Sequence, residues 1–292
     1  GKVVQGFARE DLFTVVLEHF QTDTADYADF ILPATTQLEH WDVHSAYGHT
    51  DVLLNRPAIA PVGQARPNTA IFRGLAARMG FTEPCFADDD ETLCRAAFSH
   101  PDGERINFNE LLDKGFATLP GPDAPFAEGR FLTPSGKCEF FSERLAAQGL
   151  DGLPDHVPNY EAAGSSASYP LAMISPPARN FLNSTFVNVK SLRDIEGEPL
   201  LEISAQDAAA RGIVTGSVVK VFNQRGTYRC KARVSDRARV GVVHGLGIWW
   251  RKFGLDGTNV NELTSQHLTD LGRGPVFYDC LVEVQLDAAP AL

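Results

Sequence analysis

Two short, nearly continuous apolar runs near the start of the chain predict buried strands. Leu12–Leu17 is the first run, and Phe30–Leu32, closed by Pro33, is the second. Continuous apolar runs of this length are typical of parallel strands that are covered on both faces. With small polar connections between them, they predict the edge of a doubly wound parallel α/β sheet.

Apolar residues then recur at helical spacing. Asn68–Met79 has this spacing, and Gly80 follows it at the position of a C-terminal cap. Two shorter helices are expected at Asp90–Phe98 and Asn107–Asp113. The first part of the chain therefore looks like the end of an α/β domain and not like a complete one.

The middle of the chain is expected to be mostly loop. Residues 115–136 are rich in Pro and Gly, and Ser135–Lys137 predicts a tight turn into Cys138–Phe141. Residues 149–170 contain few large apolar side chains, so we interpret them as a linker between two domains.

From Leu171 onward, alternation of apolar and polar residues predicts a mainly β domain. Ser204 and Gly212 bracket one short helix, as a cap and a stop. At least five strands are expected, at Leu171–Ile174, Ser217–Phe222, Thr227–Val234, Val240–Leu246 and Cys280–Val284. A small closed barrel with one or two helices accommodates this set.

Charge and composition exclude some classes of partner. The net charge of -11 over 292 residues argues against nucleic acid, which requires clustered Lys and Arg. No apolar run approaches the length of a membrane span, and residues 1–10 show no secretory signal. We therefore expect a cytoplasmic protein, while a periplasmic location stays open for the intact enzyme. The absence of an initiator Met predicts that the sequence begins within a longer protein or has been trimmed.

The five cysteines are scattered and form no CxxC pair. Their spacing matches neither a zinc site nor an iron–sulfur site, so we expect reduced, partly buried thiols.

Polar side chains are dense in Asn259–Asp279, NVNELTSQHLTDLGRGPVFYD. Asn261, Thr264, Ser265 and Asp270 place carboxamide, hydroxyl and carboxylate groups on a loop-prone run. This combination suits a large polar ligand better than a metal ion or a hydrophobic core. A surface loop stabilised by Asx and Ser/Thr turns is the alternative explanation.

The order of several segments resembles the molybdopterin oxidoreductases of the dimethyl sulfoxide reductase and formate dehydrogenase type. Five segments carry the resemblance: TDTADYADFILPATTQLEHWD at Thr22–Asp42, TPSGKCEFF at Thr133–Phe141, SPPARNFLNSTFVN at Ser175–Asn188, DAAARGIVTGSVVKVFNQRG at Asp207–Gly226, and the Asn259–Asp279 segment. Together they extend over nearly the whole chain.

The resemblance implies a fold and a domain division. Residues 1–148 would be the C-terminal part of a Rossmann-like α/β domain, 149–170 a linker, and 171–292 a dinucleotide-binding double-psi β-barrel. It also implies molybdopterin guanine dinucleotide with molybdenum as the cofactor.

The resemblance assigns cofactor contacts to side chains of both parts. In the β-barrel part these are Arg179, Asn183, Ser184, Thr185, Asn261, Thr264, Asp270, Arg273 and Tyr278; in the α/β part they are Thr22, Thr24, Asp29 and Glu39. Asp270 is a plausible partner for an N–H edge of guanine or pterin, and Arg273 and Tyr278 for a phosphate or a ring.

Several of these residues have ordinary structural explanations. Glu39 could instead form an ion pair with Arg56 or Arg66. The Trp249–Trp250 pair is typical of a core or an interface. His40, His44 and His49 are close in sequence, but Pro33 and Gly48 argue for irregular backbone, so we predict no metal site there.

The iron–sulfur motif and the molybdenum ligand of this family are not found in the sequence. We therefore expect an oxidoreductase as the intact protein, with no catalytic residue in this chain and no iron–sulfur cluster bound by it. The expected partners are the remaining N-terminal portion of the enzyme and an electron-transfer subunit.

Two other functions stay open. The chain could be a non-catalytic interaction module derived from the same domain. A hydrolase on a barrel is the second alternative, for which His244 and His267 are the candidate bases, although no nucleophile elbow is present.

Overall fold

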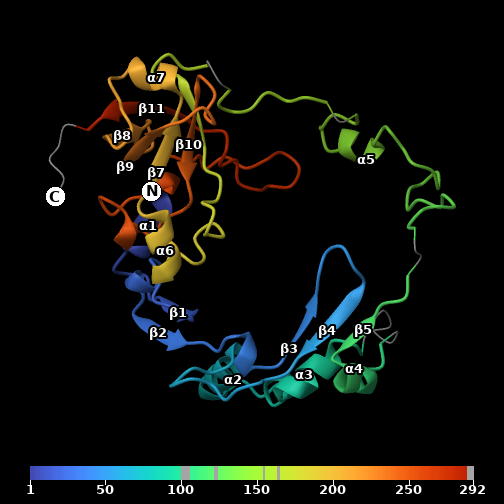
Figure 1. The fold of residues 1–292 in the computed structure, drawn as a ribbon. Coiled ribbons are helices and arrows are strands. Elements are labelled where there is room, and N and C mark those ends of the chain that lie inside the picture. Colours follow the sequence, from blue (N-terminus) through green and yellow to red (C-terminus); the bar gives the residue numbers. More distant parts are fainter. Residues whose placement is uncertain (100–105, 122–123, 154, 163–164, 288–292) are drawn as a thin grey trace. The chain divides into compact units, whose positions relative to one another are not determined.

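The described residues fold into two compact units. The computed structural model describes residues 1–99, 106–121, 124–153, 155–162 and 165–287. Unit 1 consists of Gly1–Thr14, Thr22–Tyr27 and His156–Leu292, and unit 2 of Val15–Gln21 and Ala28–Asp155 (Figure 1). Residues 122 and 123 of the predicted loop and residues 154, 163 and 164 of the predicted linker lie outside the described residues.

Unit 1 is built around a closed barrel of six strands. They are β6 (Leu171–Ile174), β7 (Leu200–Ile203), β8 (Val218–Phe222), β9 (Thr227–Val234), β10 (Val242–Leu246) and β11 (Leu281–Leu286). Around the barrel the order is β10-β6-β11-β8-β9-β7. The β10–β6 and β7–β9 pairs are parallel and the other pairs antiparallel.

Alternation along these strands produces the barrel core. In β8, Val219 and Val221 are fully buried, whereas Lys220 between them is exposed. Successive side chains of a strand point to opposite faces, so every second residue enters the interior. Leu171, Met173, Leu201, Ile203 and Val243 complete the centre of this core.

Unit 1 also contains short helices, some of which connect the barrel strands. The α-helices of unit 1 are α1 (Lys2–Phe7), α6 (Lys190–Glu196) and α7 (Ala205–Ala209), and its 3-10 helices are η1 (Ala25–Tyr27), η4 (Arg251–Phe253) and η5 (Val260–Glu262). The Ser204 hydroxyl caps α7 by accepting a hydrogen bond from the Asp207 N–H at 3.1 Å, as the sequence predicts.

Unit 2 contains two small sheets. The parallel pair consists of β1 (Val15–Glu18) and β2 (Phe30–Pro33). The antiparallel sheet has the order β3 (Asp42–Ser45), β4 (Asp51–Asn55) and β5 (Phe116–Thr118). A core around Leu111, Val52, Leu54 and Phe108 packs beneath the antiparallel sheet.

The helices of unit 2 are short except for one. They are η2 (Gln37–Glu39), α2 (Asn68–Met79), η3 (Pro84–Phe86), α3 (Asp90–Ala96), α4 (Phe108–Lys114) and α5 (Glu143–Ala146). Gly80 ends α2 with a φ of 78°, in the left-handed region that favours glycine. None of the helices within the described residues has the length and apolar content that a membrane crossing requires.

The predicted mixture of an α/β part and a small closed barrel is therefore confirmed. The structure contains several elements that the sequence did not predict: α1, α5, α6, β7 and the β3–β4 hairpin. It also contains β5, which lies in the stretch that was expected to be loop.

The cysteines are all free thiols, and three of them are buried. Burial raises the pKa of Cys230 to about 12 and that of Cys280 to about 11. Thiols with such pKa values are poor nucleophiles at neutral pH.

Candidate functional site

Unit 1 contains a pocket of about 660 Å³ next to the barrel. Polar, charged and aromatic side chains mix in its lining, and they come from segments far apart in the sequence. The lining consists of Gly1, Lys2, Val3, Val4, Asp23, Ser175, Pro177, Asn183, Ile248, Arg251, Asn259, Asn261, Glu262, Thr264, Gln266, Pro275, Phe277 and Tyr278. Its volume is in the range of small-molecule and cofactor sites.

One wall of the pocket is the loop that follows β6. Leu182 and Thr185 form an isolated bridge, which makes a tight turn around Asn183. Asn183 and Phe186 have φ values of 54° and 75°, in the left-handed region that residues other than glycine rarely adopt. The Trp250 indole N–H donates a hydrogen bond to the Ser184 carbonyl at 2.8 Å and so holds this turn from outside.

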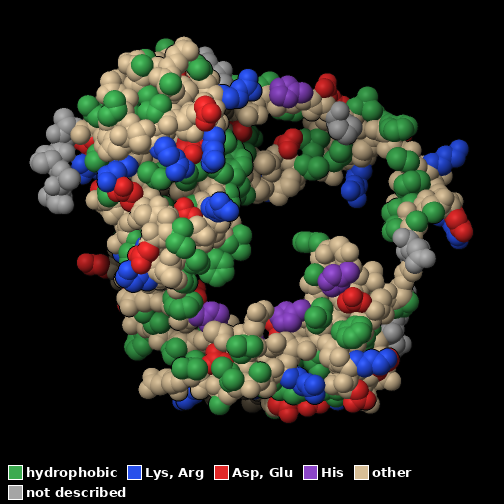
Figure 2. Space-filling view, viewed as in Figure 1, with side chains coloured by type: hydrophobic (Ala, Val, Ile, Leu, Met, Phe, Trp, Pro, Cys, Tyr) green, Lys and Arg blue, Asp and Glu red, His purple; other side chains and the backbone are tan. Residues whose placement is uncertain are grey.

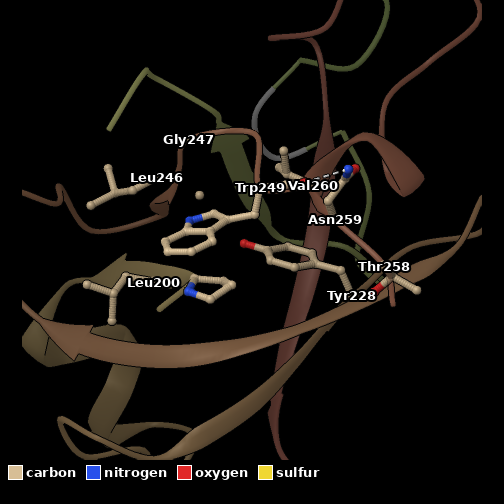
Figure 3. A pocket seen from close by; sticks show the side chains of 10 residues that line it. Leu200, Tyr228, Leu246, Gly247, Trp249, Thr258, Asn259 and Val260 are labelled. Carbon is tan, nitrogen blue, oxygen red and sulfur yellow. Dashed lines mark hydrogen bonds between the residues drawn. The ribbon is translucent and has the colours of Figure 1, made fainter. Parts of the chain in front are cut away.

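A second wall is the segment around η5. The Asn259 side chain donates to the Trp249 carbonyl at 2.9 Å (Figure 3). It also accepts from the Asn261 N–H at 3.0 Å. The Thr264 hydroxyl donates to the Asn261 carbonyl at 3.1 Å. These bonds fix the backbone that presents Asn261 and Thr264 to the pocket.

The η5 segment packs closely against the β8–β9 hairpin, and this packing positions the second wall of the pocket. A Cβ atom at Gly226 would lie 2.8 Å from the Glu262 carbonyl oxygen, which is too close for any side chain. Glycine in the hairpin turn therefore allows η5 to rest directly on the barrel.

The charges of the pocket converge on Arg251. Its backbone N–H donates to the Asp23 carboxylate at 2.6 Å, and its guanidinium contacts Glu262 at 3.0 Å. The guanidinium also donates to the Gly257 carbonyl at 2.7 Å. These three contacts fix Arg251, so it offers a preorganised guanidinium, already paired with Glu262 on one side, to an anionic group.

The last wall is the loop between η5 and β11, which contains Phe277 and Tyr278. Their rings meet edge-on at 4.6 Å. Further along the loop, His267 stacks on Tyr160 with ring centres 4.7 Å apart.

Glu161, next to Tyr160, anchors the base of this loop to the barrel. It forms an ion pair with Arg225 and accepts a hydrogen bond from the Leu281 N–H at 2.8 Å. Burial would raise the pKa of Glu161, but these hydrogen bonds more than offset it and hold the pKa below the usual 4.5.

A much smaller cavity of about 10 Å³ is lined by residues of the barrel strands and of the segment around Asn259. Figure 3 shows the Tyr228 hydroxyl pointing toward the Trp249 ring across this cavity. Asn259 borders both the small cavity and the larger pocket. The volume corresponds to about one water molecule, so we treat the larger pocket as the candidate site.

Four of the residues that the sequence singles out line the larger pocket together: Asn183, Asn261, Thr264 and Tyr278. They come from two segments that the sequence places far apart. Arg179, Ser184, Thr185, Asp270 and Arg273 are also in unit 1 but are exposed outside the lining. Thr22 and Thr24 flank Asp23, whose side chain lines the pocket.

Asp29 and Glu39 belong to unit 2. Glu39 is buried, and its carboxylate accepts hydrogen bonds from the Thr36 N–H at 2.6 Å and the Val62 N–H at 2.6 Å. The Thr36 N–H bond is the largest of the causes that lower the pKa of Glu39. Among the described ion pairs, none joins Glu39 to Arg56 or Arg66, so the structural role of Glu39 is a capping box on η2.

The sequence did not indicate Asp23, Arg251, Glu262 or Phe277 as site residues. Asp23 stands between two residues that it did indicate, and Arg251 follows the Trp249–Trp250 pair directly. The position between two candidates is the signal that would have found Asp23, and a charged residue directly after an apolar run is the signal for Arg251.

The histidines have ordinary neighbours. His40 contacts the Thr35 hydroxyl at 2.9 Å, and His244 pairs with the buried Glu202 at 3.2 Å. Within the part of the chain that the structure describes, no group of three His, Cys, Asp or Glu side chains could hold a metal ion.

Charges on the molecular surface are mixed in sign. On the face that Figure 2 shows, Lys and Arg side chains lie among Asp and Glu side chains and form no large patch of one sign. Many of them are paired, as in the Arg211–Glu283 ion pair at 2.6 Å.

Two family models match the chain. The first, described as "Molydopterin dinucleotide binding domain", matches residues 171–281, and the second, described as "Molybdopterin oxidoreductase", matches residues 1–78. The pocket draws side chains from both matched ranges.

Similar proteins include the probable oxidoreductase YoaE of Bacillus subtilis, which is 38% identical over 97% of this chain and 41% of its own length. The dimethyl sulfoxide/trimethylamine N-oxide reductase of Cereibacter sphaeroides is 33% identical over 81% of this chain and 32% of its own length. The chain thus spans about two fifths or less of the length of these curated relatives.

A solved structure has the same fold. Acetylene hydratase from Pelobacter acetylenicus superposes with a TM-score of 0.79 at 21% identity, over 97% of this chain and 41% of that one. The family matches and the reductase relatives agree with the predicted cofactor class, a molybdopterin dinucleotide that carries molybdenum. The chain belongs to the molybdopterin oxidoreductases of the dimethyl sulfoxide reductase type, and it includes their dinucleotide-binding domain.

Proposed function

We propose that the pocket of unit 1 binds the nucleotide portion of a molybdopterin guanine dinucleotide. The observation that carries the proposal is the meeting of Asn183 with Asn261, Thr264 and Tyr278 around one pocket of about 660 Å³. Two separate loops were expected to contact the cofactor, and both contribute side chains to this one cavity.

The chemistry of the lining fits such a ligand. Carboxamides and hydroxyls can donate to and accept from a base or a ribose, and Asn183, Asn261 and Thr264 supply them. Arg251 supplies a fixed cation for a phosphate group. Phe277 and Tyr278 supply aromatic faces for a ring.

The other predicted residues would contact parts of the cofactor that extend beyond the pocket. Arg179, Ser184 and Thr185 adjoin the Asn183 loop, whereas Asp270 and Arg273 belong to the loop that ends in Tyr278. Thr22 and Thr24 would act beside Asp23. Asp29 and Glu39 would contribute to the cofactor groove and the substrate funnel from unit 2.

When bound, the molybdenum cofactor would supply two-electron redox chemistry, such as oxygen-atom or hydride transfer. The residues of this chain would bind the cofactor, orient it and exclude water from it. We propose no catalytic residue among them.

The assembled protein would be an oxidoreductase that includes further chain, because the relatives are much longer than this sequence. An electron-transfer subunit would complete the redox path. Within this architecture we propose that residues 171–292 form a double-psi barrel, that 149–170 are a linker, and that 1–148 end a Rossmann-like domain.

Titration with GDP by calorimetry tests the proposal on the chain itself. We expect saturable binding that Asn183→Ala and Asn261→Ala each weaken about two- to tenfold, the value of one net hydrogen bond. Gln206→Ala is the matched control, because Gln206 is an exposed carboxamide on α7 outside the pocket.

The same titration separates the proposal from its alternative. Absence of GDP binding up to millimolar concentration would contradict a nucleotide site on this chain and would favour the interaction module. If Asn183→Ala, Asn261→Ala and Gln206→Ala all bind GDP as tightly as the wild type, the nucleotide binds outside this pocket.

A further inference from the structure

Two buried tryptophans follow β10, and their indole rings face different surroundings. Trp249 is 4% exposed and Trp250 is 9% exposed, so both belong to the hydrophobic cluster with Phe181 and Val187. The Trp249 ring packs edge-on against Phe181 at 5.2 Å and borders the small cavity in Figure 3. The Trp250 ring stacks on Phe253 at 6.0 Å.

Trp249 contacts the loop that forms a wall of the larger pocket through the Phe181 ring, whereas Trp250 donates a hydrogen bond to the turn of that loop. The Trp250 indole N–H donates this hydrogen bond to the Ser184 carbonyl at 2.8 Å, and Ser184 is the direct neighbour of Asn183. A buried indole N–H normally finds a partner, and here the partner is the backbone of the proposed binding loop.

The loop needs an external support because its own conformation is unfavourable. Asn183 at a φ of 54° and Phe186 at 75° both lie in the left-handed region. Such conformations persist where the surrounding structure determines them, and they concentrate at ligand sites. The Leu182 and Thr185 backbone bonds, at 3.2 Å and 2.9 Å, close the turn around Asn183, and the Val189 N–H donates to the Phe186 carbonyl at 2.9 Å.

We infer that Trp250 is a positioning residue of the dinucleotide site. Its indole N–H holds the Ser184 carbonyl, and thereby orients Asn183 toward the pocket before the ligand binds. Preorganisation of this kind lowers the entropic cost of binding. The inference rests on the proposed function, since the pocket must bind a nucleotide for the orientation of Asn183 to matter.

Two matched variants isolate the indole N–H. Trp250→Phe keeps an aromatic ring in the cluster and removes the donor to Ser184. Trp249→Phe is the control: it also shortens a buried indole, but it keeps the backbone carbonyl that accepts from Asn259. Each variant is compared with the wild-type chain by GDP calorimetry, thermal unfolding, and hydrogen–deuterium exchange.

We expect Trp250→Phe to raise the Kd for GDP about fivefold, the value of one net hydrogen bond. Exchange should accelerate in a peptide spanning residues 181–188 and stay unchanged in β8 and β9. Trp249→Phe should lower the Tm at least as much, while the Kd stays within about twofold and exchange in the turn at residues 183–186 stays at the wild-type rate. Residue 181 is left out of this comparison, because its ring packs on Trp249.

Equal affinity and equal exchange in Trp250→Phe and the wild type would overturn the inference. A loss of affinity that follows the Tm in both variants would also overturn it, because packing alone would then explain the effect. If Trp250→Phe does not fold, benzothienylalanine at position 250 removes the N–H and preserves the ring shape.

Absence of GDP binding by the wild-type chain would reject the proposed function separately. The exchange comparison would then decide by itself whether Trp250 holds the loop.

Discussion

The barrel of unit 1 and the parallel strand pair of unit 2 use similar residues in different ways. Val219, Val221 and Val243 in the barrel are fully buried. In the β1–β2 pair, Phe30 is 60% exposed and Ile31 is 41% exposed. Each barrel strand pairs with two neighbours, whereas within the described residues β1 and β2 pair only with each other.

The difference shows that an apolar strand sequence does not determine its own burial. A closed barrel removes strand edges and encloses every second side chain. Parallel strands reach comparable burial only when both faces are covered. We therefore expect the stability of unit 1 to come from its core, and that of the β1–β2 pair to depend much less on each apolar side chain.

The largest expected effect compares one apolar strand residue from each region. Leu201→Ala removes a side chain that is 0% exposed and should lower the free energy of unfolding of unit 1 by about 2–5 kcal/mol. Ile31→Ala should cost about 1 kcal/mol or less, because Ile31 is already partly in water.

Urea denaturation followed by circular dichroism measures both costs. In a Trp41→Phe background, fluorescence comes only from Trp249 and Trp250 and reports on unit 1. Equal costs for the two substitutions would contradict the comparison.

A middle-sized effect concerns the ion pair at the base of the pocket loop. The pKa of Glu161 is below 4.5, so its contribution to stability is complete above the unfolded pKa and is lost as pH falls through the lower, folded pKa. Glu161→Gln should destabilise unit 1 by about 2 kcal/mol at pH 7, the value of hydrogen bonds to a charged group.

The same substitution should flatten the acid dependence of unit 1. Thermal unfolding between pH 3 and pH 7 measures this: the Tm of the wild type should fall below pH 4.5 more steeply than that of Glu161→Gln. Parallel pH profiles of the two proteins would show that the Arg225–Glu161 pair is not responsible.

The smallest expected effect compares helix caps in the two units. Ser204 caps α7 in unit 1, and Asn107 caps α4 in unit 2 by accepting from the Asn109 N–H at 3.0 Å. Replacement of either cap by Ala should cost about 1 kcal/mol. Hydrogen exchange should show each loss in its own unit only, and a loss that spreads to both units would mean that they unfold together.

Local signals explain which elements the sequence predicted. Leu171–Ile174, the β8–β9 hairpin and the Ser204 cap were predictable, because alternation, a Gly-containing turn and a capping hydroxyl are local patterns. β7 was missed because it lacks alternation: its last three residues are all buried, and one of them, Glu202, is charged. The β3–β4 hairpin was missed because its Asp and His residues disguise the alternation.

The residues of the candidate site also fall into two groups, those with a local signal in the sequence and those without one. Asn183, Asn261 and Thr264 stand in polar loops, where their number attracts attention. Arg251 and Glu262 become site residues only through contacts with Asp23 and Gly257, which lie in other segments or across a turn. Such contacts follow from the closure of the barrel, which a single sequence does not display.

Gly226 limits how this protein can change over generations. Any side chain there would collide with the Glu262 carbonyl, so a substitution at this partly buried position of the hairpin turn would shift the wall that presents Asn261. A turn of this kind usually tolerates mutation and drifts freely. Here selection on the proposed dinucleotide site would act against such drift, and a library randomised at position 226 should return glycine.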